Sequence, residues 1–156
     1  MRMLFKQRFF SWFDSYDIYN DAGDVIFSVQ GKLAWGKKLE IYDASQKHIG
    51  TLEQRIFQFM PTYDLYLNGS FVGTIHKRFS LFHPEFDIDC NGWYVEGNWA
   101  EWDYRIFDNT GAQIAYISKE LFNWTDTYVL DVYNVANAVT VLMIALAIDA
   151  EKESRN

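Results

Sequence analysis

The chain has 156 residues, which is enough for one domain with a substantial core and gives little reason to expect two. Apolar residues make up 49% and aromatic residues 19% of the sequence, which excludes a disordered chain and favours β-sheet. The formal net charge of -7 argues against nucleic acid as a partner, and the single cysteine, Cys90, excludes an intrachain disulfide and fits a reducing compartment.

The N-terminal residues Met1–Asp14 carry charges inside their apolar stretch. Lys6 and Arg8 interrupt the run that a signal peptide would need, and no small-residue cleavage site follows. We therefore expect no signal peptide and a cytoplasmic protein.

A short alternating pattern recurs along most of the chain. In each copy an aromatic or apolar residue, a polar residue and an aliphatic residue precede a polar turn and a second alternating run. The central aliphatic residues are Ile18, Ile41, Leu65, Ile88, Ile106 and Leu130. Alternation of this kind is typical of strands with one buried face, so each copy is predicted to form a β-hairpin.

Turn-forming residues separate the two strands of each predicted hairpin. They are Ala22–Asp24, Ser45–Lys47, Asn68-Gly69, Asn91-Gly92 and Asn109–Gly111. Asn-Gly is a strong hairpin signal because a type I′ turn needs positive φ at both central residues. We expect about twelve short strands between about residues 3 and 132, which would close into a barrel or divide into a sandwich.

The pattern changes at Val135. Residues 135–148 carry no charge and no period of two, so a helix is predicted over about 134–150, with Asp131 or Asn134 as its N-cap. A helix that is apolar on all sides is buried, and this run is shorter than the roughly 20 residues of a membrane span. We expect no transmembrane span, and a tail anchor is the alternative.

A buried helix favours the barrel over the sandwich, because it fills the lumen. The predicted fold is therefore mainly β: a single domain over residues 1–156, built as a closed antiparallel barrel of about twelve strands around a central, buried, hydrophobic C-terminal helix. Such a helix leaves no room for a ligand inside the barrel.

Four short motifs resemble the LURP-one-related family. They are Lys6–Trp12, Gly36–Asp43, Asp126–Val129 and Leu146–Asp149. The family is similar in fold to the C-terminal domain of tubby proteins and to phospholipid scramblases, and the resemblance implies a tubby-like barrel of about twelve strands around a hydrophobic helix. Tubby domains bind phosphoinositide head groups through basic residues, but those residues cannot be aligned with this chain and are not carried over.

Catalytic signals are weak. The histidines are His48, His76 and His83. Residues Gly69–Gly73 do not match the nucleophile elbow of serine hydrolases. We expect no catalytic residue, no cofactor and no enzymatic activity; the alternative is a small enzyme with an unrecognised site, marked by a pocket that holds a histidine and a carboxylate within hydrogen-bond reach.

Metal and carbohydrate sites are also weakly indicated. His83, Glu85, Asp87, Asp89 and Cys90 could supply metal ligands. Zinc sites use paired Cys or His at short spacing, however, so we expect no metal. The acidic residues Glu96, Glu101 and Asp103 surround Trp99 and Trp102. Tryptophans could stack on sugar rings, but aromatic packing in a small barrel explains them better.

Basic residues beside aromatic ones form the remaining candidate site. Lys32, Lys37 and Lys38 lie in one predicted connection around Trp35, and His76, Lys77 and Arg78 follow the predicted strand Phe71–Ile75, close to Phe79 and Phe82. Cations interleaved with aromatics suit an anionic head group at a membrane interface. The alternative is a solvated strand edge, where lysine discourages pairing with another chain, and the net charge favours this alternative.

The sequence thus predicts a monomeric, non-enzymatic binding or scaffold domain. Its expected partner is an acidic phospholipid head group at a membrane surface, bound peripherally, or a protein. A carbohydrate- or protein-binding module is a further alternative.

Overall fold

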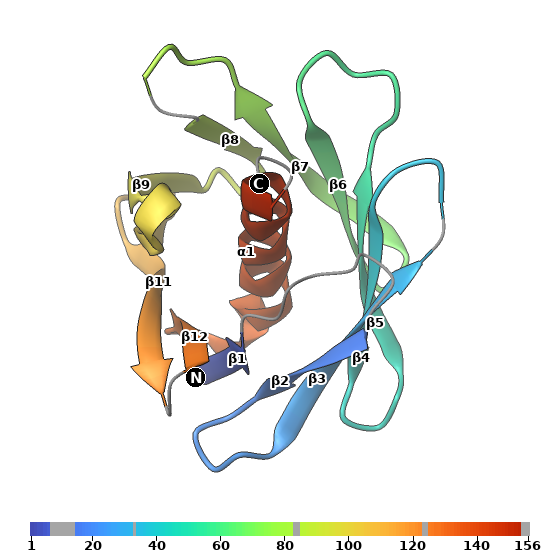
Figure 1. The fold of residues 1–156 in the computed structure, drawn as a ribbon, viewed down its shortest axis with the longest axis vertical. Helices are drawn as coiled ribbons and strands as arrows, with labels where there is room; N and C mark the ends of the chain where they lie inside the picture. The colour runs from blue at the N-terminus through green and yellow to red at the C-terminus, as the bar shows by residue number, and fades with distance from the viewer. Residues whose placement is uncertain (7–14, 33, 83–84, 123–124, 154–156) are drawn as a thin grey trace.

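The computed structural model describes residues 1–6, 15–32, 34–82, 85–122 and 125–153. In this part of the chain twelve antiparallel strands form one sheet that curls around a single α-helix, α1 (Ala138–Glu153) (Figure 1). The strands are β1 (Arg2–Lys6), β2 (Ser15–Tyr19), β3 (Val25–Lys32), β4 (Lys38–Asp43), β5 (His48–Gln54), β6 (Thr62–Leu67), β7 (Ser70–Arg78), β8 (Glu85–Asp89), β9 (Tyr94–Asn98), β10 (Asp103–Phe107), β11 (Gln113–Phe122) and β12 (Thr125–Val132). The predicted mainly β fold around a central C-terminal helix is confirmed.

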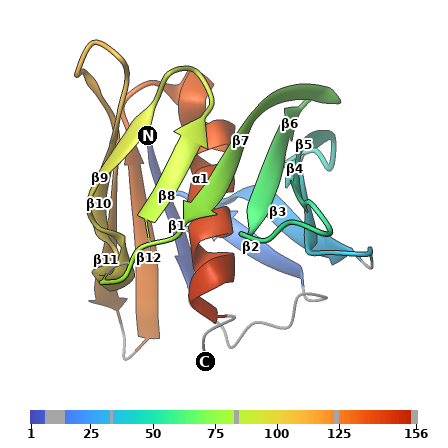
Figure 2. The ribbon, with the colours of Figure 1, turned by 90° about the horizontal axis from the view of Figure 1, so that it is seen from above.

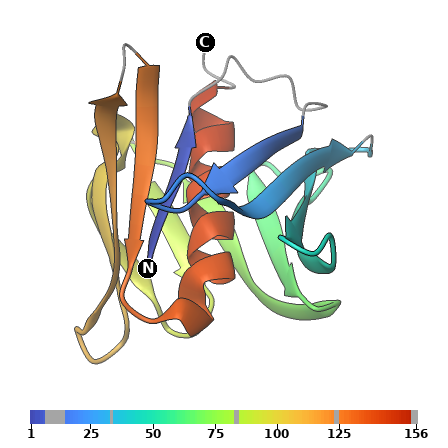
Figure 3. The same cartoon turned by 90° about the horizontal axis from the view of Figure 1, so that it is seen from below.

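Strands that are neighbours in the sheet are mostly neighbours in the chain. The order is β8-β7-β6-β5-β4-β3-β2-β1-β12-β11-β10-β9. β1 pairs with β12 over five positions and with β2 at Leu4↔Tyr19, so the N-terminal strand joins the two halves of the sheet (Figure 3). β8 and β9 are the two ends of this order, and no ladder joins them.

Alternation turns one face of the strands toward the helix. The aliphatic residues of the repeat are fully buried in five of its six copies: Ile18, Ile41, Leu65, Ile106 and Leu130. In the other copy Ile88 is only partly buried. The repeat therefore marks the inner face of the barrel, and the copy on β8 departs from it.

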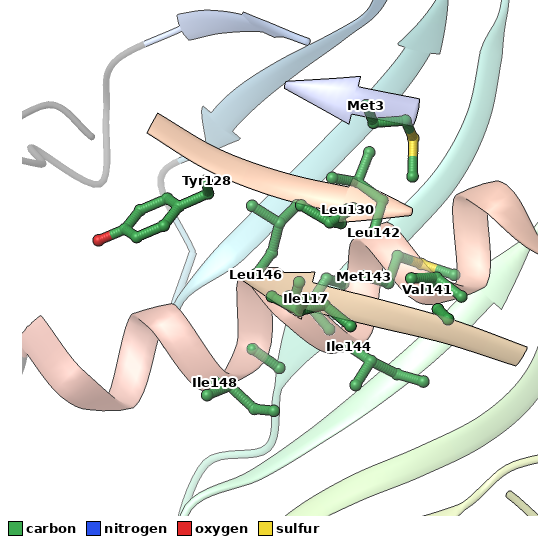
Figure 4. Packing of buried hydrophobic residues seen from close by; sticks show 14 of the residues in the cluster. Met3, Ile117, Tyr128, Leu130, Val141, Leu142, Met143, Ile144, Leu146 and Ile148 are labelled. Carbon is green, nitrogen blue, oxygen red and sulfur yellow. The ribbon is translucent and has the colours of Figure 1, made fainter. Parts of the chain in front are cut away.

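The helix α1 fills the barrel. Its residues Val141–Ala150 are all buried, and Figure 4 shows Leu142, Ile144 and Leu146 packed among side chains from β1, β11 and β12. A helix with no polar face can be accommodated only where sheet surrounds it. No helix among the described residues is long and apolar enough to cross a membrane.

The helix begins and ends later than predicted. A 3-10 turn, η2 (Val135–Asn137), precedes it, and the cap is Asn134, whose side chain accepts the Ala136 N–H at 3.0 Å. Asp131, the other predicted cap, instead lies on β12 and pairs with Arg2. At its far end α1 continues to Glu153, and its acidic residues Asp149 and Glu151 are buried.

Asn68-Gly69 forms the predicted two-residue turn, but Asn91-Gly92 does not build a hairpin. Both residues of the second pair have positive φ, 57° and 69°, yet β8 and β9 diverge from the turn that connects them (Figure 2). Cys90 and Trp93, on either side of this turn, are both buried. Their side chains pack into the core, and the two strands leave the turn in different directions.

Candidate functional site: the loop rim at the end of α1

Three connections lie together at the end of the barrel where α1 ends. Because the strands are antiparallel, the connections β3–β4, β5–β6 and β7–β8 fall on one side of the sheet, along the top and the upper right of Figure 1. Lys37, in the first of them, donates from Nζ to the Ala150 carbonyl at 2.9 Å, which ties this side to the C-terminal end of the helix. We call residues 34–37, 55–61 and 79–82 the loop rim.

The loop rim displays large apolar side chains to solvent. Six of them are between 70% and 97% exposed: Trp35, Phe57, Phe59, Phe79, Leu81 and Phe82. Single exposed apolar residues are ordinary, but a group of them on neighbouring loops marks an interaction surface. The residues come from all three loops, so the apolar character belongs to the whole rim.

The opposite end of the barrel is built differently. Its connections are short polar turns such as Asn68-Gly69 and Asp108–Ala112. Exposed apolar residues occur there too, chiefly Tyr133 and Val135 at 63% and 68%. They follow β12 and do not form the tips of neighbouring loops.

Phe57 adopts an unusual backbone conformation. Its φ of 59° lies in the left-handed region, which costs a residue with a Cβ roughly 1–2 kcal/mol. Its side chain is 97% exposed, so internal packing does not offset this cost. Strain at an exposed aromatic residue points to a function outside the fold.

The predicted basic residues cluster beside the loop rim, on strands as well as in connections. Lys32 ends β3 and Lys38 begins β4, and the two face each other in the ladder. His76, Lys77 and Arg78 lie on β7 itself, whereas the sequence placed them after a strand ending at Ile75. The strand is longer because its ladder with β8 continues to Arg78↔Glu85.

Two of the six predicted head-group residues are engaged at the end of α1. Lys37 binds the Ala150 carbonyl, and the Lys77 ammonium lies 3.7 Å from the Glu151 carboxylate in a largely buried pair. Cations at a helix C-terminus are stabilised by the helix dipole. Both lysines therefore support the fold, and their part in binding a head group stays a prediction.

Most of the remaining basic residues have acidic neighbours. His76 Nε2 lies 3.2 Å from Asp87, and Arg78 pairs with Glu85. Lys32 lies 4.0 Å from Glu40. These pairs are exposed, and Lys38 has no ion pair among the described residues. The predicted residues do not converge into one cationic pocket.

Sequence reasoning named Trp35, Phe79 and Phe82 but missed Arg55, Phe57 and Phe59. Arg55 directly precedes the β5–β6 tip and binds Asp64 through Nε at 2.9 Å. The pattern that led to the predicted sites, a basic residue close to aromatic residues in a connection, also occurs at Arg55, Phe57 and Phe59. It could have identified them. Without the topology nothing indicated that these connections meet.

The polar end of α1 is a second unexpected feature. Glu151 is buried and accepts the Tyr63 hydroxyl at 2.6 Å. Burial and the Glu151 carboxylate raise the pKa of Tyr63 far above its ordinary value. Burial, followed by the nearby Asp149 carboxylate, raises the pKa of Tyr104 in the same way. These phenols stay protonated, and the Tyr63 hydroxyl serves as a hydrogen-bond donor.

Among the described residues, the structure gives little support to the other sequence candidates. No metal-binding group occurs in the part of the chain that the structure describes, from which His83 is excluded. Burial raises the pKa of the Cys90 thiol, which makes it a poor nucleophile. Trp102 is buried and stacks on Tyr128 with ring centroids 3.9 Å apart, so it cannot offer a face to a sugar.

Comparison with known proteins agrees with this architecture. The chain is 25% identical over 150 residues to the uncharacterized protein YxjI of Bacillus subtilis, covering 96% of this chain and 92% of that protein. A crystal structure of an Arabidopsis thaliana protein superposes with a TM-score of 0.61 at 15% identity, covering 95% of this chain and 90% of the other, which supports the fold alone. The family model described as LURP-one-related matches residues 1–149. The chain therefore belongs to the LURP-one-related family.

Proposed function

We propose that this protein is a non-enzymatic domain that binds anionic membrane surfaces peripherally through the loop rim. The observation that carries the proposal is the group of nearly fully exposed aromatic and aliphatic side chains on three neighbouring loops. A protein of this kind would act in the cytoplasm, as a monomer, at the inner face of a membrane.

The chemistry of each loop matches a membrane interface. Aromatic rings favour the head-group region, and a phenylalanine side chain gains about 1.5–3 kcal/mol when it is fully removed from water. Lys38 and Lys32 flank Trp35, Arg55 precedes Phe57, and Arg78 precedes Phe79. Each basic residue near an anionic surface adds about 1 kcal/mol.

The two contributions are needed together. A single apolar anchor gives only marginal membrane binding, and stable attachment usually takes an apolar and an electrostatic signal. The net charge of -7 opposes approach to an anionic surface, so the local cations matter. The cations of the rim ion pairs, Lys32, Arg55 and Arg78, are themselves 43%, 44% and 56% exposed, and pairs near the surface contribute little, so these cations can turn to phosphates.

An enzymatic function is less well supported. His76 and Asp87 do form a histidine–carboxylate pair, at 3.2 Å between Nε2 and Oδ2, but both side chains are about 40% exposed on paired positions of β7 and β8. A catalytic pair is expected inside a pocket, next to a nucleophile or an electrophile. Neither residue lines the hollow nearest to it, which opens beside Arg78 and Glu85.

Vesicle co-sedimentation tests the proposal. We compare phosphatidylcholine vesicles with vesicles that also contain phosphatidylserine, at low and high salt. The apolar variant is Phe57→Asn/Phe59→Ser, since asparagine tolerates the left-handed backbone at position 57. The matched control is Tyr133→Ser/Val135→Ser, which removes exposed apolar side chains from the other end of the barrel.

We expect the chain to sediment with the anionic vesicles, less so with added salt, and the fluorescence of exposed Trp35 to shift to shorter wavelength. The rim variant should bind the anionic vesicles at least about tenfold more weakly, because it loses the free energy of burying one or two phenylalanine side chains. The control variant should bind as the wild type does. Lys32→Gln/Lys38→Gln should weaken binding without touching the helix end that Lys37 and Lys77 support. Equal loss in rim and control variants, or no binding to anionic vesicles at low salt, would contradict the proposal.

A further inference from the structure

The sheet has one unpaired seam, between β8 and β9. The strand order runs from β8 around to β9, and the outer edges of these two strands have no neighbouring strand among the described residues. Unpaired strand edges expose backbone donors and acceptors that can pair with another chain. We call the gap between β8 (Glu85–Asp89) and β9 (Tyr94–Asn98) the seam.

The backbone of β8 presents hydrogen-bonding groups to the seam. The Lys77 N–H donates to the Pro61 carbonyl at 2.9 Å, on the β6 side, so Lys77 does not bond to β8. Lys77 faces Phe86 in the β7–β8 ladder. In an antiparallel ladder alternate residues direct their N–H and C=O groups to opposite sides, so those of Phe86 and Ile88 point away from β7 and into the seam.

A hollow of about 530 Å³ lies in the seam. Phe86, Val95 and Trp99 line it, and the Phe86 and Trp99 rings meet edge to face at 4.8 Å between centroids. Phe86, Ile88 and Val95 also pack against the core. Arg78, Glu85 and Asn98 also line the hollow, so its apolar part is the side formed by Phe86, Val95 and Trp99, which could receive the apolar side chains of an added strand.

The outer side of the seam is acidic. Along β8 the polar residues Glu85, Asp87 and Asp89 alternate with the apolar ones, and Glu96 follows Val95 on β9. Asp89 and Glu96 form no ion pair among the described residues, whereas Arg78 pairs with Glu85 and Asp87, and Asp87 also pairs with His76. A strand placed here would meet apolar neighbours on its inner face and carboxylates on its outer face.

We infer that the seam binds an extended peptide by strand addition, and that the peptide alternates apolar and basic residues. Its backbone would bond to Phe86 and Ile88, its apolar side chains would enter the hollow, and its cations would face Asp89 and Glu96. Strand addition to an exposed sheet edge is an established mode of peptide recognition. The inference does not depend on membrane binding, which uses other elements.

The test uses a synthetic peptide that alternates lysine and valine, labelled for fluorescence polarisation. Its control has the same composition with all lysines before all valines, so that both peptides carry equal charge. The protein variants are Phe86→Pro and Phe86→Ala. Both remove the ring, but only proline removes the N–H that faces the seam, and neither removes a bond to β7.

We expect the alternating peptide to bind the wild-type chain and the block peptide to bind at least about tenfold more weakly. Phe86→Pro should lose a further factor of about ten relative to Phe86→Ala, as the loss of one backbone hydrogen bond implies. Glu96→Gln should weaken binding by a smaller factor.

Amide hydrogen exchange gives an independent readout. In the free chain the Phe86 and Ile88 amides should exchange faster than the Asp87 amide, which belongs to the β7–β8 ladder, and peptide binding should slow exchange at Phe86 and Ile88 but not at Asp87. Equal binding of the two peptides, equal affinities of the two Phe86 variants, or unchanged exchange at Phe86 would each overturn the inference. Both Phe86 variants should bind anionic vesicles as the wild type does, so failure here is distinct from failure of the membrane proposal.

Discussion

At the scale of single residues, two aspartates hold equivalent hairpin turns. Asp43 Oδ1 accepts the N–H groups of Ser45 and Lys47, and Asp108 Oδ1 accepts those of Thr110 and Ala112. The sequence located both turns from their turn formers but did not identify the aspartates that organise them. In the sequence, an aspartate at the end of a strand could equally be a solvent-exposed residue with no structural role. Only the folded turn brings its carboxylate oxygen close to two backbone N–H groups.

Asp108→Asn should change how stability depends on pH. The Thr110 hydroxyl and backbone N–H groups lower the pKa of Asp108 below its ordinary value of 3.8. A carboxyl whose pKa is lower in the folded state adds stability above its unfolded pKa and loses that contribution as the pH falls through the folded one. The wild type should therefore be more stable than the variant near neutral pH, and the difference in free energy of unfolding should shrink as the pH falls below the ordinary pKa of the carboxyl.

Urea unfolding of both proteins at several pH values measures this difference. Asp89→Asn is the control, because the Asp89 carboxylate accepts no hydrogen bond among the described residues. A pH-independent difference for Asp108→Asn would show that the turn does not depend on the charge. Asp43→Asn should behave as Asp108→Asn does, since Ser45 and Lys47 lower the pKa of Asp43 in the same manner.

At the scale of elements, the local sequence pattern predicted the strands and the helix. It did not predict where the helix ends or which strands are joined as hairpins. Charged residues after Ile148 indicated that the helix ends, because acids are seldom buried. The structure buries Glu151 instead, since Tyr63 of β6 and Lys77 of β7 supply partners that lie far away in the sequence. Asn91-Gly92 similarly predicted a hairpin, and the burial of Cys90 and Trp93 overrode it.

Glu151→Ala should be strongly destabilising. It leaves the Tyr63 hydroxyl and the Lys77 ammonium without their acceptor in a buried setting, and breaking one side of such a pair costs about 3–5 kcal/mol. Urea unfolding gives the change in free energy. Glu151→Leu/Lys77→Met should recover part of the loss, because it removes both charges. A loss below about 1 kcal/mol for Glu151→Ala would mean that water reaches these groups.

At the scale of the whole molecule, the fold was predictable because its two patterns require each other. Strands with one apolar face need something to enclose, and an entirely apolar helix needs to be enclosed. The loop rim and the seam were not predictable, because both depend on which connections and edges end up adjacent. Trp35, Phe57 and Phe79 lie in separate connections, and only the antiparallel order of the strands brings them to one end of the barrel.

Removing α1 should therefore abolish folding altogether. A chain that ends after Tyr133 lacks the buried helix side chains Val141, Leu142, Met143, Ile144, Leu146 and Ile148. Each contributes about 1.5–3 kcal/mol by burial, and together they rival or exceed the roughly 5–15 kcal/mol by which a domain is stable. The inner faces of the strands would also be exposed to water.

Circular dichroism tests this prediction. We expect the truncated chain to show no cooperative thermal transition, whereas a chain that ends after Glu153 should keep one. A cooperative transition without α1 would mean that the sheet can close on itself, and the helix would then be an occupant of the barrel rather than its core.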